Sequence, residues 1–236
     1  MRRSRQLEIN FARGTWGGRR SGSGRPEGPN PRVQHRPRKD LDERTPNHVT
    51  LRVRREVGSI RTFRVVREIE ASFRKACERG KFRLVHYSIQ RDHAHLIVEA
   101  DDADVLGRGM MSIASRFARA INRALGRTGK VLADRYHLQV LTCPTQVRNA
   151  LAYVLLNARR HAAKRKARLA NTGALDGASS ARWFEGWRRD VPVDRSPPRA
   201  LGSLPAVAKP RTWFLREGWR VHGLIDPNAI PGAIGR

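Results

Sequence analysis

The chain has 236 residues and a formal net charge of +27, with 48 lysines and arginines against 21 aspartates and glutamates. Such an excess of positive charge favours a polyanionic partner, above all nucleic acid. The sequence has no apolar stretch near the roughly 18 residues that a membrane span needs, no apolar segment behind its basic N-terminus and only two cysteines, so we expect no membrane insertion, secretion, disulfide framework or four-ligand zinc site.

The N-terminal part, residues 1–46, is rich in Gly, Pro, Arg and Ser and shows neither helical nor strand periodicity. This composition predicts a disordered basic arm that adds affinity for phosphate. Ordered structure is predicted over residues 47–168, and an irregular extension follows over residues 169–236.

The first predicted elements alternate between strand and helix. Alternating apolar and polar residues predict a strand over residues 48–53. Apolar residues at helical spacing predict a helix that begins after Gly58 and ends at Gly80. Two further strands are predicted over residues 82–90 and 93–100, joined by a short polar turn.

A long helix is predicted next, from about Asp104 to Leu125. Its predicted apolar stripe consists of Met111, Ile113, Phe117, Ile121 and Leu125. Residues 130–141 contain a fourth extended segment. Pro144 begins a third helix, which we expect to run to about Arg168.

This order of elements matches the split βαβ, ferredoxin-like plan of the α+β class. We therefore expect a βαββαβ domain with a four-stranded antiparallel sheet, two helices on one face, and a further helix after the last strand. Strand alternation places the even-numbered residues His48, Thr50 and Arg52 on the face away from the two helices. The same rule places His93 and His95 on that face.

The C-terminal extension contains two aromatic segments, residues 183–188 and 213–220, and both include the sequence Glu-Gly-Trp-Arg. We predict that these tryptophans pack back on the domain as a strap. The alternative is that they stack on the bases of a single-stranded or hairpin nucleic acid.

Two sequence features have the composition of a reactive site. His93 and His95 are expected to project side by side, and two imidazoles without cysteine suit a divalent metal with an oxygen donor as third ligand; such a pair is also found as ordinary polar-face residues. Tyr153 and Asn157 lie one helical turn apart in the predicted third helix. A tyrosine there is ordinarily a packing residue, but beside a His-x-His strand it supplies a nucleophile.

Three segments together resemble the HUH single-tyrosine transposases, closest to the REP-associated tyrosine transposases: residues 92–98 (DHAHLIV), 134–137 (DRYH) and 153–157 (YVLLN). The resemblance spans roughly residues 46–165. Many REP-associated members have Pro where this chain has Ala158, so its helix is expected to continue past Asn157.

The resemblance implies a DNA transposase that cleaves and joins single strands, in transposition or in the mobilisation of palindromic repeats. It implies that His93, His95 and Asn157 bind Mg²⁺ or Mn²⁺, and that Tyr153 is the catalytic nucleophile, which forms a 5′-phosphotyrosine and leaves a free 3′-hydroxyl. A free tyrosine, with a pKa of about 10, is a weak nucleophile at neutral pH, and a bound metal ion draws charge from the phosphate.

We expect single-stranded or hairpin DNA as the partner, a monomer or homodimer, and a cytoplasmic bacterial protein that is found at the nucleoid when bound to DNA. Basic side chains expected to hold the DNA backbone are Arg52, Arg116, Arg119, Arg123, Arg159, Arg160 and Lys164. The alternatives are a non-catalytic or domesticated nucleic-acid-binding protein on the same fold, and a replication initiator or relaxase, for whose larger architecture the chain has little room.

Overall fold

The fold is that of a computed structural model, which describes residues 41–164, 175–189 and 204–232. All but the last six residues of the predicted N-terminal arm lie outside these ranges. No helix in the described part of the chain is both long and apolar enough to cross a membrane.

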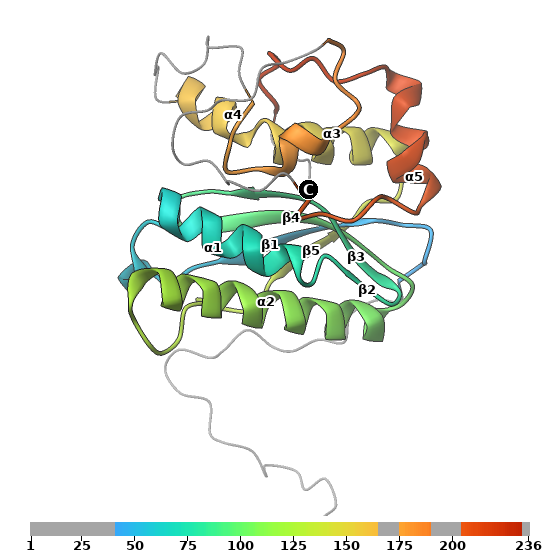
Figure 1. The fold of residues 1–236 in the computed structure, drawn as a ribbon. Coiled ribbons are helices and arrows are strands. Elements are labelled where there is room, and N and C mark those ends of the chain that lie inside the picture. The colour runs from blue at the N-terminus through green and yellow to red at the C-terminus, as the bar shows by residue number, and fades with distance from the viewer. Residues whose placement is uncertain (1–40, 165–174, 190–203, 233–236) are drawn as a thin grey trace, which may run out of the picture. The chain divides into compact units, whose positions relative to one another are not determined.

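A five-stranded antiparallel sheet, in the order β2-β3-β4-β1-β5, organises the domain (Figure 1). Its strands are β1 (Asn47–Arg52), β2 (Glu78–Arg79), β3 (Phe82–Ile89), β4 (His93–Ala100) and β5 (His137–Val140). The four longer strands confirm the ferredoxin-like prediction, because β1 lies between β4 and β5 while β3 pairs with the other side of β4. The two-residue strand β2 is an addition that the sequence pattern did not predict.

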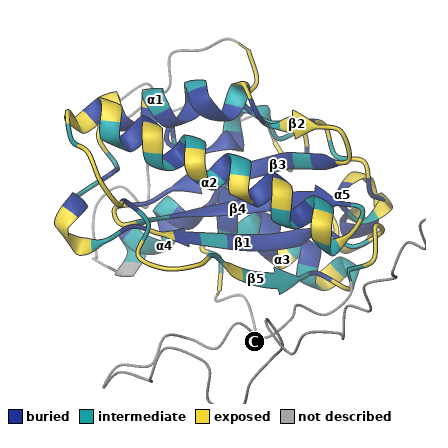
Figure 2. Cartoon of the chain, turned by 90° about the horizontal axis from the view of Figure 1, so that it is seen from below, coloured by how far each residue is buried: buried dark blue, intermediate teal, exposed yellow. Residues whose placement is uncertain are grey.

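Helices α1 (Phe63–Arg74) and α2 (Ala103–Leu125) cover one face of this sheet. Figure 2 shows both helices in front of the strands, with buried stripes on the sides that meet the sheet. The core between them contains Val49 and Leu51 from β1 and Leu96 from β4. Alternation in β1 and β4 therefore places apolar residues as predicted.

The structure corrects both ends of the first predicted helix. It begins at Phe63, after Thr62, whose hydroxyl accepts a hydrogen bond from the backbone N–H of Val65. It ends at Arg74, and the chain then enters the β2–β3 hairpin. Gly80, with φ of 58°, lies in the turn of that hairpin and is not a helix cap.

The predicted apolar stripe of α2 is wrong at two positions. Met111 is 69% exposed and Leu125 is 38% exposed, whereas Met110 is fully buried. Met110 lies three residues before Ile113, and this spacing places both on the side that meets the sheet. The spacing of apolar residues does not distinguish two consecutive methionines, because the rotation of the helix about its axis decides which of Met110 and Met111 faces the sheet.

A second layer covers the opposite face of the sheet. Helix α3 (Pro144–Leu155) packs there against β3 and β4, and α4 (Asn157–Lys164) follows it. The prediction of one helix from Pro144 to Arg168 is wrong, because the helix breaks at Leu156. Val154, Leu155, Leu156 and Asn157 are all buried, and a straight helix cannot turn four consecutive residues toward one core.

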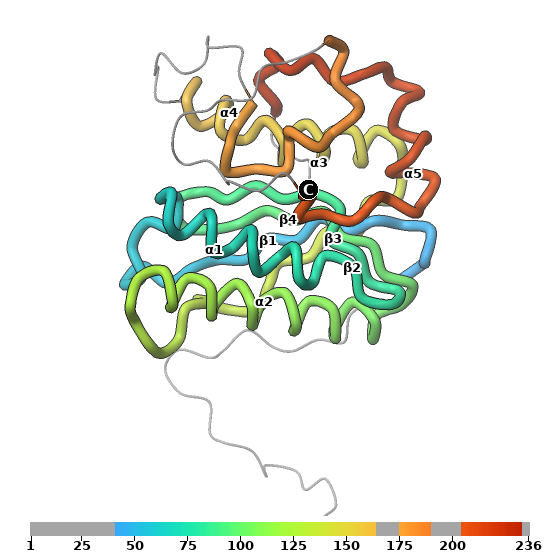
Figure 3. Tube along the Cα trace, in the orientation of Figure 1, coloured from blue at the N-terminus to red at the C-terminus, as the bar shows by residue number. Residues whose placement is uncertain are grey.

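The C-terminal extension completes this second layer, as the orange-to-red trace in Figure 3 shows. Its elements are η3 (Ser180–Trp183), α5 (Trp213–Arg216) and η4 (Gly218–His222). Trp219 is 1% exposed in a core that it shares with Leu151 of α3 and Ile97 of β4. Three of the four tryptophans thus pack as a strap, while Trp213 is 54% exposed.

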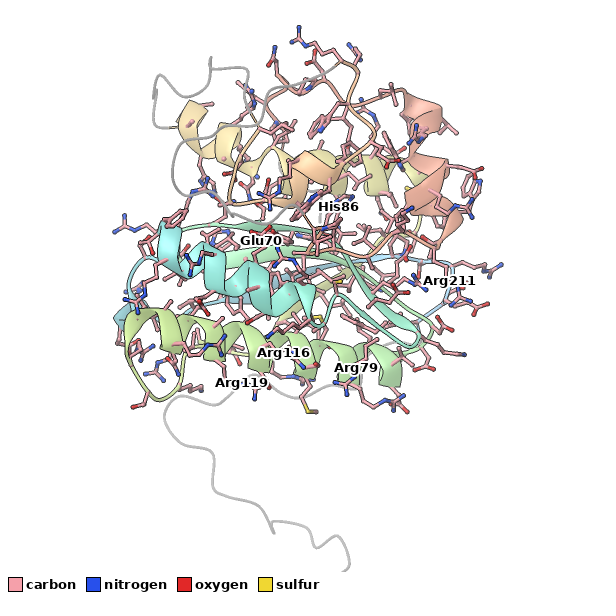
Figure 4. All side chains as sticks on the ribbon, viewed as in Figure 1. Glu70, Arg79, His86, Arg116, Arg119 and Arg211 are labelled. Carbon is pink, nitrogen blue, oxygen red and sulfur yellow. The ribbon has the colours of Figure 1, made fainter. Side chains whose placement is uncertain are left out.

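The extension also covers the edge of β3, which would otherwise present unpaired backbone groups. The N–H of Ile89 donates to the carbonyl of Ala178, and the N–H of Ala208 donates to that of Leu84. Arg182 forms an ion pair with Glu70, a buried residue of α1 (labelled in Figure 4). Residues 175–189 and 204–232 are therefore structural parts of the domain.

Candidate active site

Two histidines of β4 converge on the sheet face that α3 covers. His93 and His95 project to this face because their neighbours Ala94 and Leu96 point into the core under α1 and α2. The Nε2 atoms of the two imidazoles lie 3.0 Å apart. This is the arrangement that the His-x-His pattern predicts in a strand.

The second nitrogen of each imidazole is held by a neighbouring side chain. Nδ1 of His93 lies 2.7 Å from Oδ1 of Asp92. Nδ1 of His95 lies 3.1 Å from the hydroxyl of Thr50 and 3.2 Å from Nε2 of His48. A proton on each Nδ1, donated to these partners, leaves both Nε2 lone pairs directed toward one point.

Burial keeps the imidazoles of His95 and His48 uncharged. Desolvation, with smaller contributions from nearby cationic groups, lowers the pKa of His95 to about 2. Desolvation likewise lowers the pKa of His48 to about 4. At neutral pH both rings are therefore neutral, which is the form that binds a metal ion.

Tyr153 of α3 contacts His95 and His48 on this face. The centroid of its ring is 4.9 Å from that of His95 and 6.0 Å from that of His48. The guanidinium of Arg160, on α4, lies 5.0 Å from the same ring. Tyr153 is half-buried, so its side chain is held by the fold and still reaches solvent.

The other two tyrosines of the chain are on the opposite side of the sheet. Tyr87 is buried in the core under α1 and α2, and Tyr136 packs against that same core. The ring contacts of Tyr87 are with Phe73 and Trp183, in that core. Tyr153 is the tyrosine that the structure places against His95.

Asn157 begins α4, just after the break that ends the helix of Tyr153. Its side chain is fully buried, and neither its Oδ1 nor its Nδ2 has a hydrogen-bond partner. An unpaired buried carboxamide is costly and calls for an explanation. A ligand that binds its oxygen would supply one.

The donor set fits a divalent ion. Two ligands about 2.1 Å from an octahedral ion, at right angles to each other, lie about 3.0 Å apart, and the Nε2 atoms of His93 and His95 have this separation. No group of three His, Cys, Asp or Glu suitable for a metal occurs in the described ranges. Asn157 has a buried amide oxygen without a hydrogen-bond partner, which is a donor of the type that such an ion accepts.

The predicted DNA-binding residues divide into those near this site and those away from it. Arg52 is exposed and pairs with His93 across β1 and β4, and Arg160 lies over Tyr153. Arg159 is 6% exposed, and burial lowers its pKa, so the structure does not support a contact between Arg159 and the DNA backbone. The side chain of Lys164 lies outside the described part of the structure.

The three arginines of α2 that were predicted to bind DNA lie on the far side of the sheet. Figure 4 shows Arg116 and Arg119 on that helix, away from α3. Arg123, further along α2, forms an ion pair with Glu68 of α1. The sheet and its core separate these side chains from Tyr153. Any phosphate that they bind would be distant from the histidine pair.

Sequence reasoning missed the residues that orient the pair. Asp92 was read only as part of a turn, although a carboxylate next to a histidine is a typical orienting group. His48 and Thr50 were placed on the correct face without a role. The register of β1 against β4, which sets Thr50 opposite His95, was the missing information. His161, whose ring centroid is 6.3 Å from that of His93, was also missed.

Two comparisons with known proteins found similarities to transposases. Residues 45–153 match the model of the family described as IS200-like transposases. A solved structure of a REP-associated tyrosine transposase bound to a REP hairpin is similar over 55% of this chain and 74% of that chain, with 15% identity and a TM-score of 0.45. No curated protein matches the chain.

Proposed function

We propose that this chain is a DNA transposase of the IS200-like kind, whose family model matches residues 45–153, and that it cleaves and rejoins single-stranded DNA with Tyr153 as its nucleophile. The observation that carries the proposal is the position of Tyr153, with its ring 4.9 Å from that of His95. The family match ends at Tyr153, and the residues that follow it in α4 are assigned from their surroundings alone.

The proposed reaction exchanges one phosphodiester for another. The phenolic oxygen of Tyr153 forms a bond to phosphorus and loses its proton, while the bond from phosphorus to the 3′ oxygen breaks and that oxygen takes up a proton. The products are a 5′-phosphotyrosine and a free 3′-hydroxyl. The phosphotyrosine is itself a diester, so a second 3′-hydroxyl can displace Tyr153 and join the strands without an external energy source.

We propose that His93, His95 and Asn157 hold the divalent ion, Mg²⁺ or Mn²⁺, which when bound would withdraw charge from the scissile phosphate. Asp92 and Thr50 would orient the two imidazoles through their contacts with the Nδ1 atoms. The buried Oδ1 of Asn157 has no hydrogen-bond partner, and binding to the ion would satisfy it.

The positive groups around Tyr153 are suited to hold the phosphate. The guanidinium of Arg160, 5.0 Å from the ring, can donate to a phosphate oxygen at the height of the phenol. Arg52, exposed at the end of β1, can hold the next stretch of backbone. The preference for hairpin DNA comes from the family resemblance and is part of the proposal.

A cleavage assay on a labelled hairpin oligonucleotide with single-stranded flanks tests this function. With Mg²⁺ or Mn²⁺ we expect cleavage and a covalent adduct, and with EDTA neither. His93→Ala or His95→Ala should abolish cleavage and leave affinity for the oligonucleotide within about threefold, because the phosphate contacts remain. Loss of cleavage together with an equal loss of binding would mean that the histidines are structural, and cleavage that persists in both variants would refute the proposal.

A further inference from the structure

We propose that the C-terminal extension forms a pocket for one unpaired base of single-stranded DNA, over the edge of β3. The inference rests on the proposed function only in taking DNA as the ligand. The pocket has a volume of about 680 Å³, which lies in the usual range for sites that bind small molecules or single nucleotides. Residues from η3, the segment before α5, and η4 line it.

A bulge in β3 turns a histidine toward this pocket. The register of β3 against β4 shifts between Leu84 and His86. Val85 packs in the core on the α3 side, and His86 lines the pocket, so two consecutive residues point away from α1 and α2. Bulges that re-aim a side chain are common beside functional sites. Figure 4 labels His86 where β3 meets the second layer.

The hydrogen bonds of His86 define what it offers a ligand. Its Nδ1 lies 3.1 Å from the hydroxyl of Ser180. That hydroxyl donates to the carbonyl of Tyr87 at 3.2 Å and accepts from the N–H of Tyr87 at 2.9 Å, so it also accepts from Nδ1–H. Nε2 then carries a lone pair. The hydrogen bond of the His86 ring is made by Nδ1, and Nε2 is not one of the fully buried atoms without a partner. Nε2 can therefore accept a hydrogen bond from an amino or imino group of a base.

Aromatic rings supply stacking surfaces in the same pocket. Trp183 and Phe184 line it and are both half-buried. The guanidinium of Arg182 lies 4.1 Å from the ring centroid of Trp183, which fixes one face of the indole. A Cβ at Gly186 would stand 2.4 Å from the ring of Phe184 and 2.3 Å from that of Trp219. Glycine in the first Glu-Gly-Trp-Arg segment therefore permits this ring arrangement.

The rim of the pocket carries positive charge for the phosphates beside the base. Lys209 lines it, is exposed, and pairs with no carboxylate of the described chain. Arg220 is also exposed at the rim, whereas Arg216 forms an ion pair with Glu217, and Glu185 is a second carboxylate of the lining. Base stacking combined with backbone-directed cations is how proteins hold single strands. His86 pairs with Ile97, two residues along β4 from His95, so we expect one DNA strand to reach both the pocket and the histidine pair.

An abasic scan tests this pocket separately from catalysis. The affinity of the Tyr153→Phe variant is measured, because this variant should bind DNA without cleaving it. The ligands are hairpin oligonucleotides whose single-stranded flanks carry one abasic site, placed at a different nucleotide in each oligonucleotide. We expect one abasic position to weaken binding by about tenfold. In protein that also carries Phe184→Leu, that penalty should disappear while the penalties at other positions stay the same.

Lys209→Ala provides a second variant that leaves the packing untouched. It should weaken binding of the intact oligonucleotide at least threefold, whereas Arg108→Ala, which removes an exposed arginine of α2, should have a smaller effect. A flat abasic scan, or a penalty that survives Phe184→Leu in a protein with unchanged melting temperature, overturns the pocket. Cleavage by protein with Tyr153 intact decides the proposed function independently of either result.

Discussion

Nε2 of His93 and Nε2 of His95 lie 3.0 Å apart on β4, and each ring is fixed by a partner at its other nitrogen. The arrangement is pre-organised for an ion that both can bind, because no side chain has to move to bring the lone pairs together. This relationship determines most of what we expect of the protein.

Asp92→Asn should weaken metal binding and leave DNA binding in place. The carboxylate of Asp92 orients His93 through a 2.7 Å contact with Nδ1, and loss of such a partner typically lowers metal affinity about 10- to 100-fold. The concentration of Mn²⁺ that gives half-maximal cleavage should rise by that factor. Asp104→Asn removes an exposed carboxylate from the first turn of α2 and is the matched control; an equal shift in both variants would refute an orienting role.

Glu99→Ala should destabilise the domain by about 2–4 kcal/mol in urea unfolding. The buried carboxylate of Glu99 accepts hydrogen bonds from the backbone N–H groups of Arg211 and Thr212, and these bonds attach the extension to β4. Arg211→Ala keeps both donors, because they belong to the backbone. It should cost less than about 1 kcal/mol, since it removes only an exposed side chain near Asp101. Equal losses would contradict this role of Glu99.

The free energy of unfolding should fall as the pH is lowered from about 6.5 toward 3. Burial lowers the pKa of His86 to about 3, while an unfolded histidine titrates near 6.5. Between these values the unfolded chain binds a proton that the folded chain does not. Each such histidine therefore adds a slope of about 1.4 kcal/mol per pH unit. His86→Asn, whose amide can still donate to Ser180, should flatten the slope by about that amount, and an unchanged slope would contradict a neutral buried His86.

Affinity for single-stranded DNA should fall steeply with salt. The net charge of +27 implies several phosphate contacts, and each contributes about −0.7 to the slope of log K against log salt concentration for a single strand. Arg160→Ala should remove about one phosphate contact and so make the slope shallower by about 0.7. A titration in NaCl that gives a slope near zero would remove the electrostatic part of the account.

Much of the fold could be predicted from periodicity, because a strand with a core on one side must alternate. Alternation placed His93 and His95 on the correct face. The end of α3 could not be predicted in this way. Leu155 and Leu156 meet a second core that the extension creates, and nothing in the local sequence of that helix indicates where the extension packs.

The sequence was enough to predict which residue types form the site, but not which neighbouring side chains contact and orient them. Histidine and tyrosine are few in this chain, so their spacing was informative. Arginine is abundant, and its pattern could not distinguish the buried Arg159 from Arg160, one residue later and beside Tyr153. Strand register, which brings Thr50 to His95, depends on pairing between distant segments.

Identification of the residue that carries the DNA tests the central claim most directly. The adduct formed with a hairpin oligonucleotide is digested, and the peptide that retains a nucleotide is sequenced by mass spectrometry. We predict that the modified residue is Tyr153, that Tyr153→Phe forms no adduct, and that Tyr136→Phe forms as much as the unaltered protein. A nucleotide on Tyr136, or an adduct that persists in Tyr153→Phe, would contradict the account.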